Sequence, residues 1–175
     1  MITLLRRTLP FALSVLVAAV LAACTQPSAP APQSVRSSTD LVAAIEAAGR
    51  QDDSVIHVEP LRKPGVKPLL DKVDMQKAAH DYEAAAATLD KALELSPDAP
   101  DLLQDRAELA VRLGDYVQAE KLARKSYSLG AKMGSLCARN WQTVLEMRRI
   151  AKDSASVQSA RKMLANCEKS GPVRM

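Results

Sequence analysis

The apolar residues in the last part of the chain recur at intervals of three and four, which is the spacing of one face of an α-helix. In residues 154–167 this face carries Val157, Ala160, Met163 and Leu164. Residues 135–151 follow a similar but less regular pattern, and only two residues separate the two segments. The pattern therefore predicts two antiparallel helices joined by a tight turn.

Two stretches farther upstream repeat each other at a distance of 34 residues. They read HDYEAAAATLDKALELSPDAP from residue 80 and GDYVQAEKLARKSYSLGAKMG from residue 114. The matched pairs are Asp81 and Asp115, Tyr82 and Tyr116, Ala85 and Ala119, Leu95 and Leu129, and Leu69 and Leu103. The period and the ending ALELSPDAP resemble the tetratricopeptide repeat family. The resemblance implies an all-α fold, a tetratricopeptide-type stack of three helical hairpins over residues 67–168, after a disordered N-terminal linker.

The turns of these repeats have a physical logic. Gly114 permits a tight turn between antiparallel helices, and Asp115 is placed to cap the helix that follows. The first repeat has His80 where glycine is usual. The third hairpin is shifted, because Asp115 and Asp153 are 38 residues apart. The additional four residues correspond to about one helical turn.

The N-terminal segment has the features of an export signal. Arg6 and Arg7 precede 16 mostly apolar residues, a run that is short for a membrane span. The run ends in LAAC, residues 21–24, which resembles a bacterial lipobox; the resemblance implies cleavage after residue 23 and acylation of Cys24. An uncleaved anchor is the alternative. Thr25 stands where an Asp would favour the inner membrane, so we expect a lipid anchor at the periplasmic face of the outer membrane.

The region between this signal peptide (residues 1–23) and the repeats is rich in proline. Residues 24–39 contain three prolines and too few apolar residues to bury a core, so we expect a disordered linker. Residues 40–48 predict a short helix that is capped by Asp40 and ends near Gly49. The prolines after it predict an irregular arm, so that residues 40–66 form a short helix and an arm. Residues 169–175 are expected to be a tail.

The composition favours packed helices over sheets. Without the signal segment the aromatic residues are Tyr82, Tyr116, Tyr127 and Trp141, so the core has to consist of Ala, Leu, Val and Met, with Trp141 as its one large ring. Cys137 and Cys167 lie at the start of one predicted helix and the end of its antiparallel partner. These ends are adjacent in a hairpin, and the periplasm permits disulfides, so a Cys137–Cys167 bond is favoured over two buried free thiols.

The chemistry of an enzyme is missing from the sequence. His57 and His80 have no Cys, Asp or Glu at metal-ligand spacing, so we expect no metal site and no cofactor. The chain has no phosphate loop, nucleophile elbow or HExxH helix. Removal of the signal peptide lowers the net charge from +4 to +2, which is too little to indicate nucleic acid. The sequence predicts a non-enzymatic interaction protein.

The family resemblance also indicates where a partner would bind. In tetratricopeptide proteins the first helix of each hairpin lines a concave groove that takes peptides or helices. In the register of this chain, the resemblance places the following residues there: Leu70, Asp74 and Lys77 from the first repeat, Gln104, Glu108, Val111 and Arg112 from the second, and Arg139 and Gln142 from the third.

The third hairpin is basic, since residues 132–175 hold 9 basic and 3 acidic residues. Two interpretations are open: a solvated end of the stack, or a docking surface for an acidic patch on a protein partner. Anionic wall polymer and lipid headgroups are weaker options. In the docking interpretation the contacts include Arg148, Arg149 and Lys152.

A more specific resemblance comes from the order of the segments. A lipobox, a proline-rich linker, an arm with Val58-Glu59-Pro60-Leu61, and repeats with Ala123, Lys125, Ser126 and Arg139-Asn140-Trp141 resemble outer-membrane lipoproteins that activate a bifunctional peptidoglycan synthase. The resemblance implies a periplasmic partner, a class A penicillin-binding protein. Two other classes remain open: a pilus or secretion-system assembly lipoprotein, and a structural protein that binds the cell wall.

Replacement of the acylated residue tests the anchor. In the variant Cys24→Ser the precursor should remain unacylated and should no longer fractionate with the outer membrane. Cell fractionation and mass spectrometry of the N-terminal peptide measure this. A Cys24→Ser protein that is cleaved and still fractionates with the outer membrane would show that the lipoprotein interpretation is wrong.

Overall fold

The computed structural model describes residues 36–50 and 61–167 of the chain. The elements in this part are α2 (Ser38–Arg50), α3 (Val66–Ala78), α4 (Tyr82–Leu95), α5 (Pro100–Arg112), α6 (Tyr116–Leu129), α7 (Ser135–Ile150) and α8 (Ser154–Cys167), with no strand in these described ranges. The predicted signal peptide, Cys24, most of the linker, residues 51–60 of the arm and the tail lie outside the described residues.

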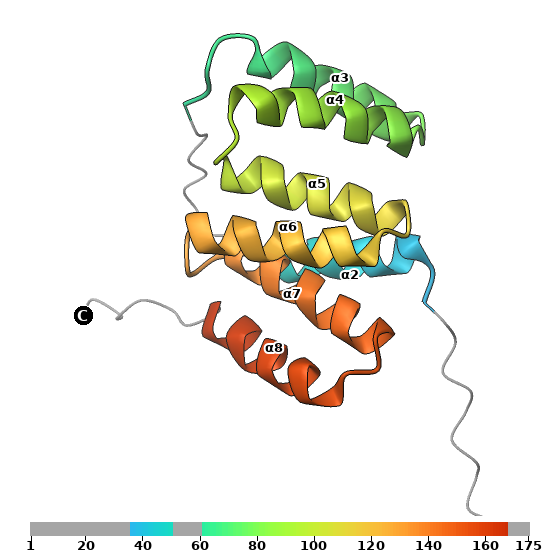
Figure 1. Ribbon diagram of the computed structural model, residues 1–175, viewed down its shortest axis with the longest axis vertical. Coiled ribbons are helices and arrows are strands. Elements are labelled where there is room, and N and C mark those ends of the chain that lie inside the picture. Colours follow the sequence, from blue (N-terminus) through green and yellow to red (C-terminus); the bar gives the residue numbers. More distant parts are fainter. Residues whose placement is uncertain (1–35, 51–60, 168–175) are drawn as a thin grey trace, which may run out of the picture. The chain divides into compact units, whose positions relative to one another are not determined.

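The helices from α3 to α8 form three antiparallel hairpins, and each hairpin packs against the next in chain order (Figure 1). The predicted all-α stack of three hairpins is confirmed. The shift of the third hairpin also has an explanation. Helix α7 has 16 residues and α5 has 13, and the connection before α7 is one residue longer than the connection before α5. These four residues separate Asp115 from Asp153 by more than one repeat.

The turns inside the three hairpins share one backbone motif. His80, Gly114 and Lys152 each adopt a left-handed conformation, with φ of 59°, 78° and 56°. The next N–H bonds back across the helix end, as from Asp115 to the carbonyl of Ala110 at 2.9 Å, which is the Schellman ending of a helix. The aspartate after each turn then caps the second helix through its carboxylate. The motif thus fixes the same turn with glycine, histidine or lysine.

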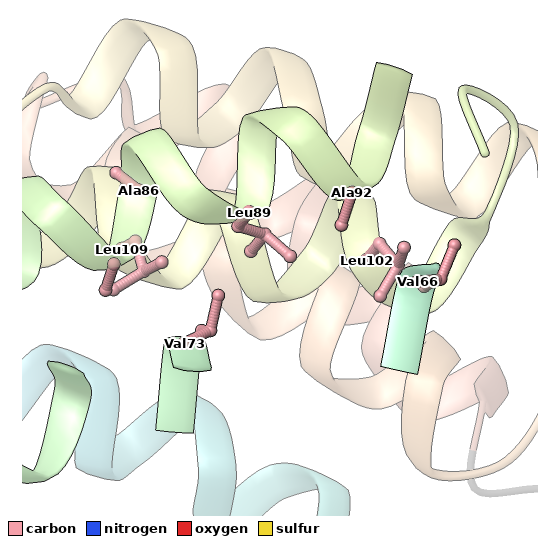
Figure 2. Packing of buried hydrophobic residues seen from close by; sticks show 8 residues of the cluster. Val66, Val73, Ala86, Leu89, Ala92, Leu102 and Leu109 are labelled. Atoms are coloured by element: carbon pink, nitrogen blue, oxygen red, sulfur yellow. The ribbon is translucent and has the colours of Figure 1, made fainter. Parts of the chain in front are cut away.

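Apolar side chains between the helices hold the stack together. Figure 2 shows Val73 of α3, Leu89 of α4 and Leu102 of α5 in the first of these clusters, and all three are buried. Ala85 and Ala119, at matched positions of the two repeats, are completely buried. Their small side chains allow the neighbouring helices to approach closely, while the leucines fill the remaining space.

The N-terminal helix α2 begins and ends differently from the prediction. It starts at Ser38, inside the expected linker, because Ser37 is the capping residue. The N–H of Asp40 donates to Ser37 Oγ at 3.1 Å, and the N–H of Ser37 donates to the Asp40 carboxylate at 3.1 Å, which is a reciprocal capping box. The hydroxyl and N–H of Ser37 hold the pKa of Asp40 below its usual value. Asp40 is therefore in the first turn rather than at the cap, and the helix continues past Gly49 to Arg50.

Helix α2 lies against α5 and α7, the first helices of the second and third hairpins (Figure 1). Leu41, Val42 and Ile45 are buried in one cluster with Val111 of α5 and Met147 of α7. At Gly49 the helix comes so close to α7 that a Cβ atom would lie 2.8 Å from Cγ of Arg139. This close approach, rather than a helix stop, explains the glycine.

The predicted bond between Cys137 and Cys167 is present, with 5.6 Å between the Cα atoms. The N–H of Gly134 also donates to the carbonyl of Cys167 at 3.1 Å. The start of α7 and the end of α8 are thus joined by a covalent bond and by a backbone hydrogen bond. The disulfide closes the last hairpin of the stack, which has a neighbouring hairpin on one side only within the described residues.

Loss of the disulfide should destabilise the domain. The variant Cys137→Ala/Cys167→Ala should lose about 3–4 kcal/mol of unfolding free energy, because the bond restricts a loop of 30 residues in the unfolded chain. Urea unfolding of the variant and of the oxidised protein measures this. Peptide mapping without reductant should recover the joined pair, and equal urea midpoints would contradict the structural role.

Truncation of the central α2 side chain should loosen its docking. Ile45 is completely buried, so Ile45→Ala should reduce the unfolding free energy by about 2–5 kcal/mol. Hydrogen exchange of the α2 amides should also become faster. The matched control is Ala43→Ser, an exposed position of the same helix. If both variants unfold at the same urea concentration as the parent protein, α2 is not docked as described.

Candidate protein-interaction surface

The predicted groove is occupied where α2 covers it. Helix α2 lies on α5 and α7, and Gln104, Glu108 and Val111 of α5 are all buried. Val111 packs with the apolar residues of α2, and Gln104 Nε2 donates to Thr143 Oγ1 of α7 at 2.9 Å. The prediction that these three side chains face an open groove is therefore wrong. The sequence contains no repeat-based signal for α2, since it lies outside the 34-residue pattern.

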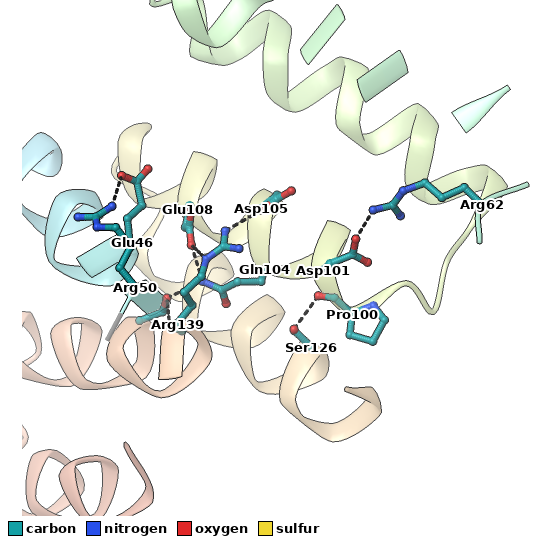
Figure 3. A network of polar contacts seen from close by, with 11 residues as sticks. Glu46, Arg50, Arg62, Pro100, Asp101, Gln104, Asp105, Glu108, Ser126 and Arg139 are labelled. Atoms are coloured by element: carbon teal, nitrogen blue, oxygen red, sulfur yellow. Dashed lines mark hydrogen bonds and ion pairs between the residues drawn. The ribbon is translucent and has the colours of Figure 1, made fainter. Parts of the chain in front are cut away.

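Arg139 stands at the centre of a polar network beneath α2. Its Nε donates to Glu108 at 2.8 Å and its Nη2 to Asp105 at 2.7 Å (Figure 3). Only 25% of the side chain is exposed. Burial opposes the charge of Arg139, but the attraction of Glu108 and then Asp105 outweighs this, so the pKa of Arg139 is raised above its usual value. This predicted contact residue is committed to an internal ion pair.

A second internal network involves Glu146 of α7, whose side chain is 1% exposed. Its Oε1 accepts from Arg36 at 3.0 Å, from Gln142 at 2.7 Å and from Arg149 at 2.8 Å. Arg36 immediately precedes α2, so this network ties the entry of the helix to α7. Gln142 and Arg149, two of the predicted contact residues, therefore contribute to docking within the chain.

The predicted groove residues of the first repeat lie away from α2. Leu70 packs against the core between α3, α4 and α5, whereas Asp74 and Lys77 are exposed. The guanidinium of Arg112 lies over the ring of Tyr82, 5.3 Å from its centre. Asp74 and Lys77 thus remain accessible, while Leu70 and Arg112 have internal partners.

The basic residues of the third hairpin are partly neutralised. Lys132 lies over the ring of Tyr127 and donates to backbone carbonyls at the end of α6. Arg148 donates to Glu120 at 2.6 Å and to Asp153 at 3.4 Å. The hydrogen bond to Glu120 raises the pKa of Arg148, and the Ser156 hydrogen bonds lower the pKa of Asp153. Lys152 is exposed in the last hairpin turn.

The short motifs that resemble synthase activators form internal contacts. Ser126 Oγ donates to the carbonyl of Pro100 at 2.6 Å (Figure 3), and Lys125 Nζ donates to that of Pro97 at 3.2 Å. Asn140 is buried, and Trp141 packs edge-on against Tyr127 with 5.0 Å between the ring centres. These residues hold α6 to the α4–α5 connection and α7 to the stack. They determine the architecture rather than an exposed contact surface.

An open cleft lies between the start of α6 and the end of α7. Its volume is about 500 Å³, and its lining residues are Tyr116, Val117, Glu120, Lys121, Arg124, Met147, Arg148, Ile150 and Ala151. Of the predicted contact residues only Arg148 is among them. The analysis of the sequence missed this surface, although one signal exists: Val117 is apolar and yet 84% exposed, at a position where the preceding repeat has Glu83.

The described residues offer binding surfaces rather than reactive groups. Within residues 36–50 and 61–167 no three His, Cys, Asp or Glu side chains are close enough together to hold a metal ion. In the same ranges, no helix combines the length and the apolar character needed to cross a membrane. The ionisable side chains with shifted pKa values, such as Arg139 and Arg148, are members of structural ion pairs.

Comparison with known proteins supports the assignment of the repeats. The tetratricopeptide repeat family model matches residues 77–125, from the end of α3 into α6. Among solved structures, the chain is similar to the globular C-terminal domain of P. aeruginosa LpoP, with 28% sequence identity and a TM-score of 0.54. The match covers 60% of this chain and 99% of that chain. No curated protein sequence matches the chain. The chain therefore carries tetratricopeptide repeats, in a helical domain that resembles that of LpoP.

Proposed function

We propose that the chain is a non-enzymatic, outer-membrane-anchored lipoprotein of the periplasm that binds and activates a bifunctional peptidoglycan synthase. The anchor would be the lipid on Cys24, and the partner a class A penicillin-binding protein. The single observation that carries this proposal is the likeness of the helical domain to the C-terminal domain of LpoP, over 99% of that chain.

The motif residues support the proposal through the fold. Ser126 and Lys125 bind the connection between α4 and α5, and Asn140 and Trp141 are part of the packing of α7. A resemblance in these residues is therefore a resemblance in the way the hairpins are joined. It supports a common architecture with the synthase activators, whereas the identity of the partner has to be decided by exposed residues.

The predicted linker gives the proposal a geometry. About 15 residues at ~3.1 Å each would span roughly 45 Å when extended. Such a length would carry the helical domain away from the outer membrane toward a synthase below the cell wall. The described domain begins at Arg36, which binds buried Glu146, so tension on the linker would act first on the docking of α2.

The internal docking of α2 restricts where the partner can bind. Tetratricopeptide proteins accept helices on the first helix of each hairpin, but α2 already lies on α5 and α7. A partner would therefore contact the accessible part of α3, or the surface that α6, α7 and α8 present away from α2. Asp74, Lys77 and Lys152 are exposed on these surfaces and stay candidate contacts.

Reconstitution with the synthase tests the function. The mature chain should bind a detergent-solubilised class A penicillin-binding protein from the same cells and increase its rate of glycan polymerisation in a saturable manner. A folded tetratricopeptide domain of another function is the control. No binding and no change in rate would contradict the proposal. Crosslinking to a secretin or pilin would indicate an assembly lipoprotein instead, and sedimentation with purified sacculi a wall-binding protein.

A further inference from the structure

The cleft between α6 and α7 combines an apolar floor with apolar edges. Met147 of α7 is buried at its base, and Tyr116 of α6 is half-buried beside it. Val117 and Ile150 stand at the edges, where they are 84% and 41% exposed. Exposed apolar side chains around a hollow lose contact with water only when another molecule covers them, which makes such a place a binding site.

Comparison of the two regular repeats shows that the fold does not require these residues. Val117, Lys121 and Arg124 of α6 correspond, 34 positions earlier, to Glu83, Ala87 and Asp90 of α4. Both helices have 14 residues and the same aspartate cap, so the same architecture accepts either set. The apolar and basic character of the α6 face is therefore a property of the cleft and not of the repeat.

The aromatic residue at the start of each helix shows the same difference. The ring of Tyr82 in α4 is covered by the guanidinium of Arg112, 5.3 Å from the ring centre. Tyr116, its equivalent in α6, has no such cation among the described residues and lines the cleft instead. The space that Arg112 covers in the first interval is thus accessible in the second.

The wall of the cleft carries an excess of positive charge. Three basic side chains and one carboxylate line it. That carboxylate, Glu120, accepts from Arg124 at 2.7 Å and from Arg148 at 2.6 Å, so one negative charge serves two guanidinium groups. Lys121 is exposed and has no hydrogen bond or ion pair with the described residues. Donors on this wall therefore remain available for further carboxylates.

We infer that the α6–α7 cleft binds a short acidic segment of a protein partner, one apolar side chain of which enters over Met147 and Tyr116 while flanking Asp or Glu residues meet Lys121, Arg124 and Arg148. This inference deepens the proposed function and rests on it only in taking the occupant to be a protein. An anionic lipid surface or wall polymer would use the cations but would leave the enclosed apolar floor without a partner.

The test variant copies the first repeat into the second. Val117→Glu/Lys121→Ala gives α6 the residues of α4, and an acidic residue in the first turn of a helix is favourable, so folding should be preserved. Reversal of Arg148 or Arg149 is less suitable, because it would set a carboxylate beside Glu120 or Glu146. The matched control is Met75→Glu/Lys91→Ala, the same two changes at exposed positions of α3 and α4.

The probe is a displayed library of random peptides, selected on the full mature chain with Cys24→Ser. Selected peptides should share one apolar residue flanked by Asp or Glu. Val117→Glu/Lys121→Ala should weaken their binding by at least about tenfold, with the control variant within about twofold, and salt should weaken it further. Isothermal titration with one synthetic peptide measures these constants, and circular dichroism verifies the folding of both variants.

Several outcomes would overturn the inference: no enriched peptide, a neutral or basic consensus, or equal affinity for the test and control variants. Binding of phosphatidylglycerol vesicles that depends on Val117 and Lys121, with no binding to phosphatidylcholine vesicles, would identify a lipid surface instead. These measurements do not involve the synthase. Failure of synthase activation with a positive peptide result would therefore reject the proposed function and leave the cleft as a protein-binding site.

Discussion

The positive charge of Arg139 has to be neutralised inside the protein, and much of the arrangement around α5 and α7 follows from this constraint. Glu108 and Asp105 of α5 supply the carboxylates at 2.8 and 2.7 Å, so the two first helices are joined by a largely buried ion pair. Removal of one partner from such a pair is costly because the other charge is left without compensation. The stem of the same arginine also forms the surface on which Gly49 of α2 lies. One side chain thus connects the stack of repeats to the helix outside it.

The docking of α2 changes what the repeat surface can do. An amphipathic helix on the first helices of tetratricopeptide hairpins is the usual arrangement of a bound partner, and here the helix belongs to the same chain. It is attached at both chemical levels: Leu41, Val42 and Ile45 fill the apolar cluster, and Arg36 reaches the buried carboxylate of Glu146. An intramolecular helix competes at a high effective concentration, so an external helix of similar affinity would not displace it. Recognition is therefore left to other surfaces, and the cleft between α6 and α7 is the one for which residue chemistry and shape agree.

The two regular repeats separate structural from functional residues within one molecule. Positions that hold the fold are kept between them: Asp81 and Asp115 cap their helices in the same way, and Ala85 and Ala119 are both completely buried. Positions on the outer face of the second helix differ in charge and polarity, from Glu83 to Val117. Since the backbone is common to both repeats, these differences reflect what each face contacts. The third hairpin keeps the turn and the cap but has a longer first helix and a disulfide, as suits the end of a stack.

Much of the fold was determined by the sequence itself, because helix boundaries, caps and hairpin turns depend on residues close together in the chain. The 34-residue period, the positions of α7 and α8 and the pairing of Cys137 with Cys167 all follow from local periodicity and from the geometry of one hairpin. The place of α2 was decided only by the tertiary structure. Its apolar face is evident in the sequence, but nothing local specifies which distant surface it covers, and that choice buries Val111 and commits Arg139 and Arg149 to partners within the chain. The cleft had the same origin, since Val117 and Met147 lie 30 residues apart and meet only because α6 packs on α7.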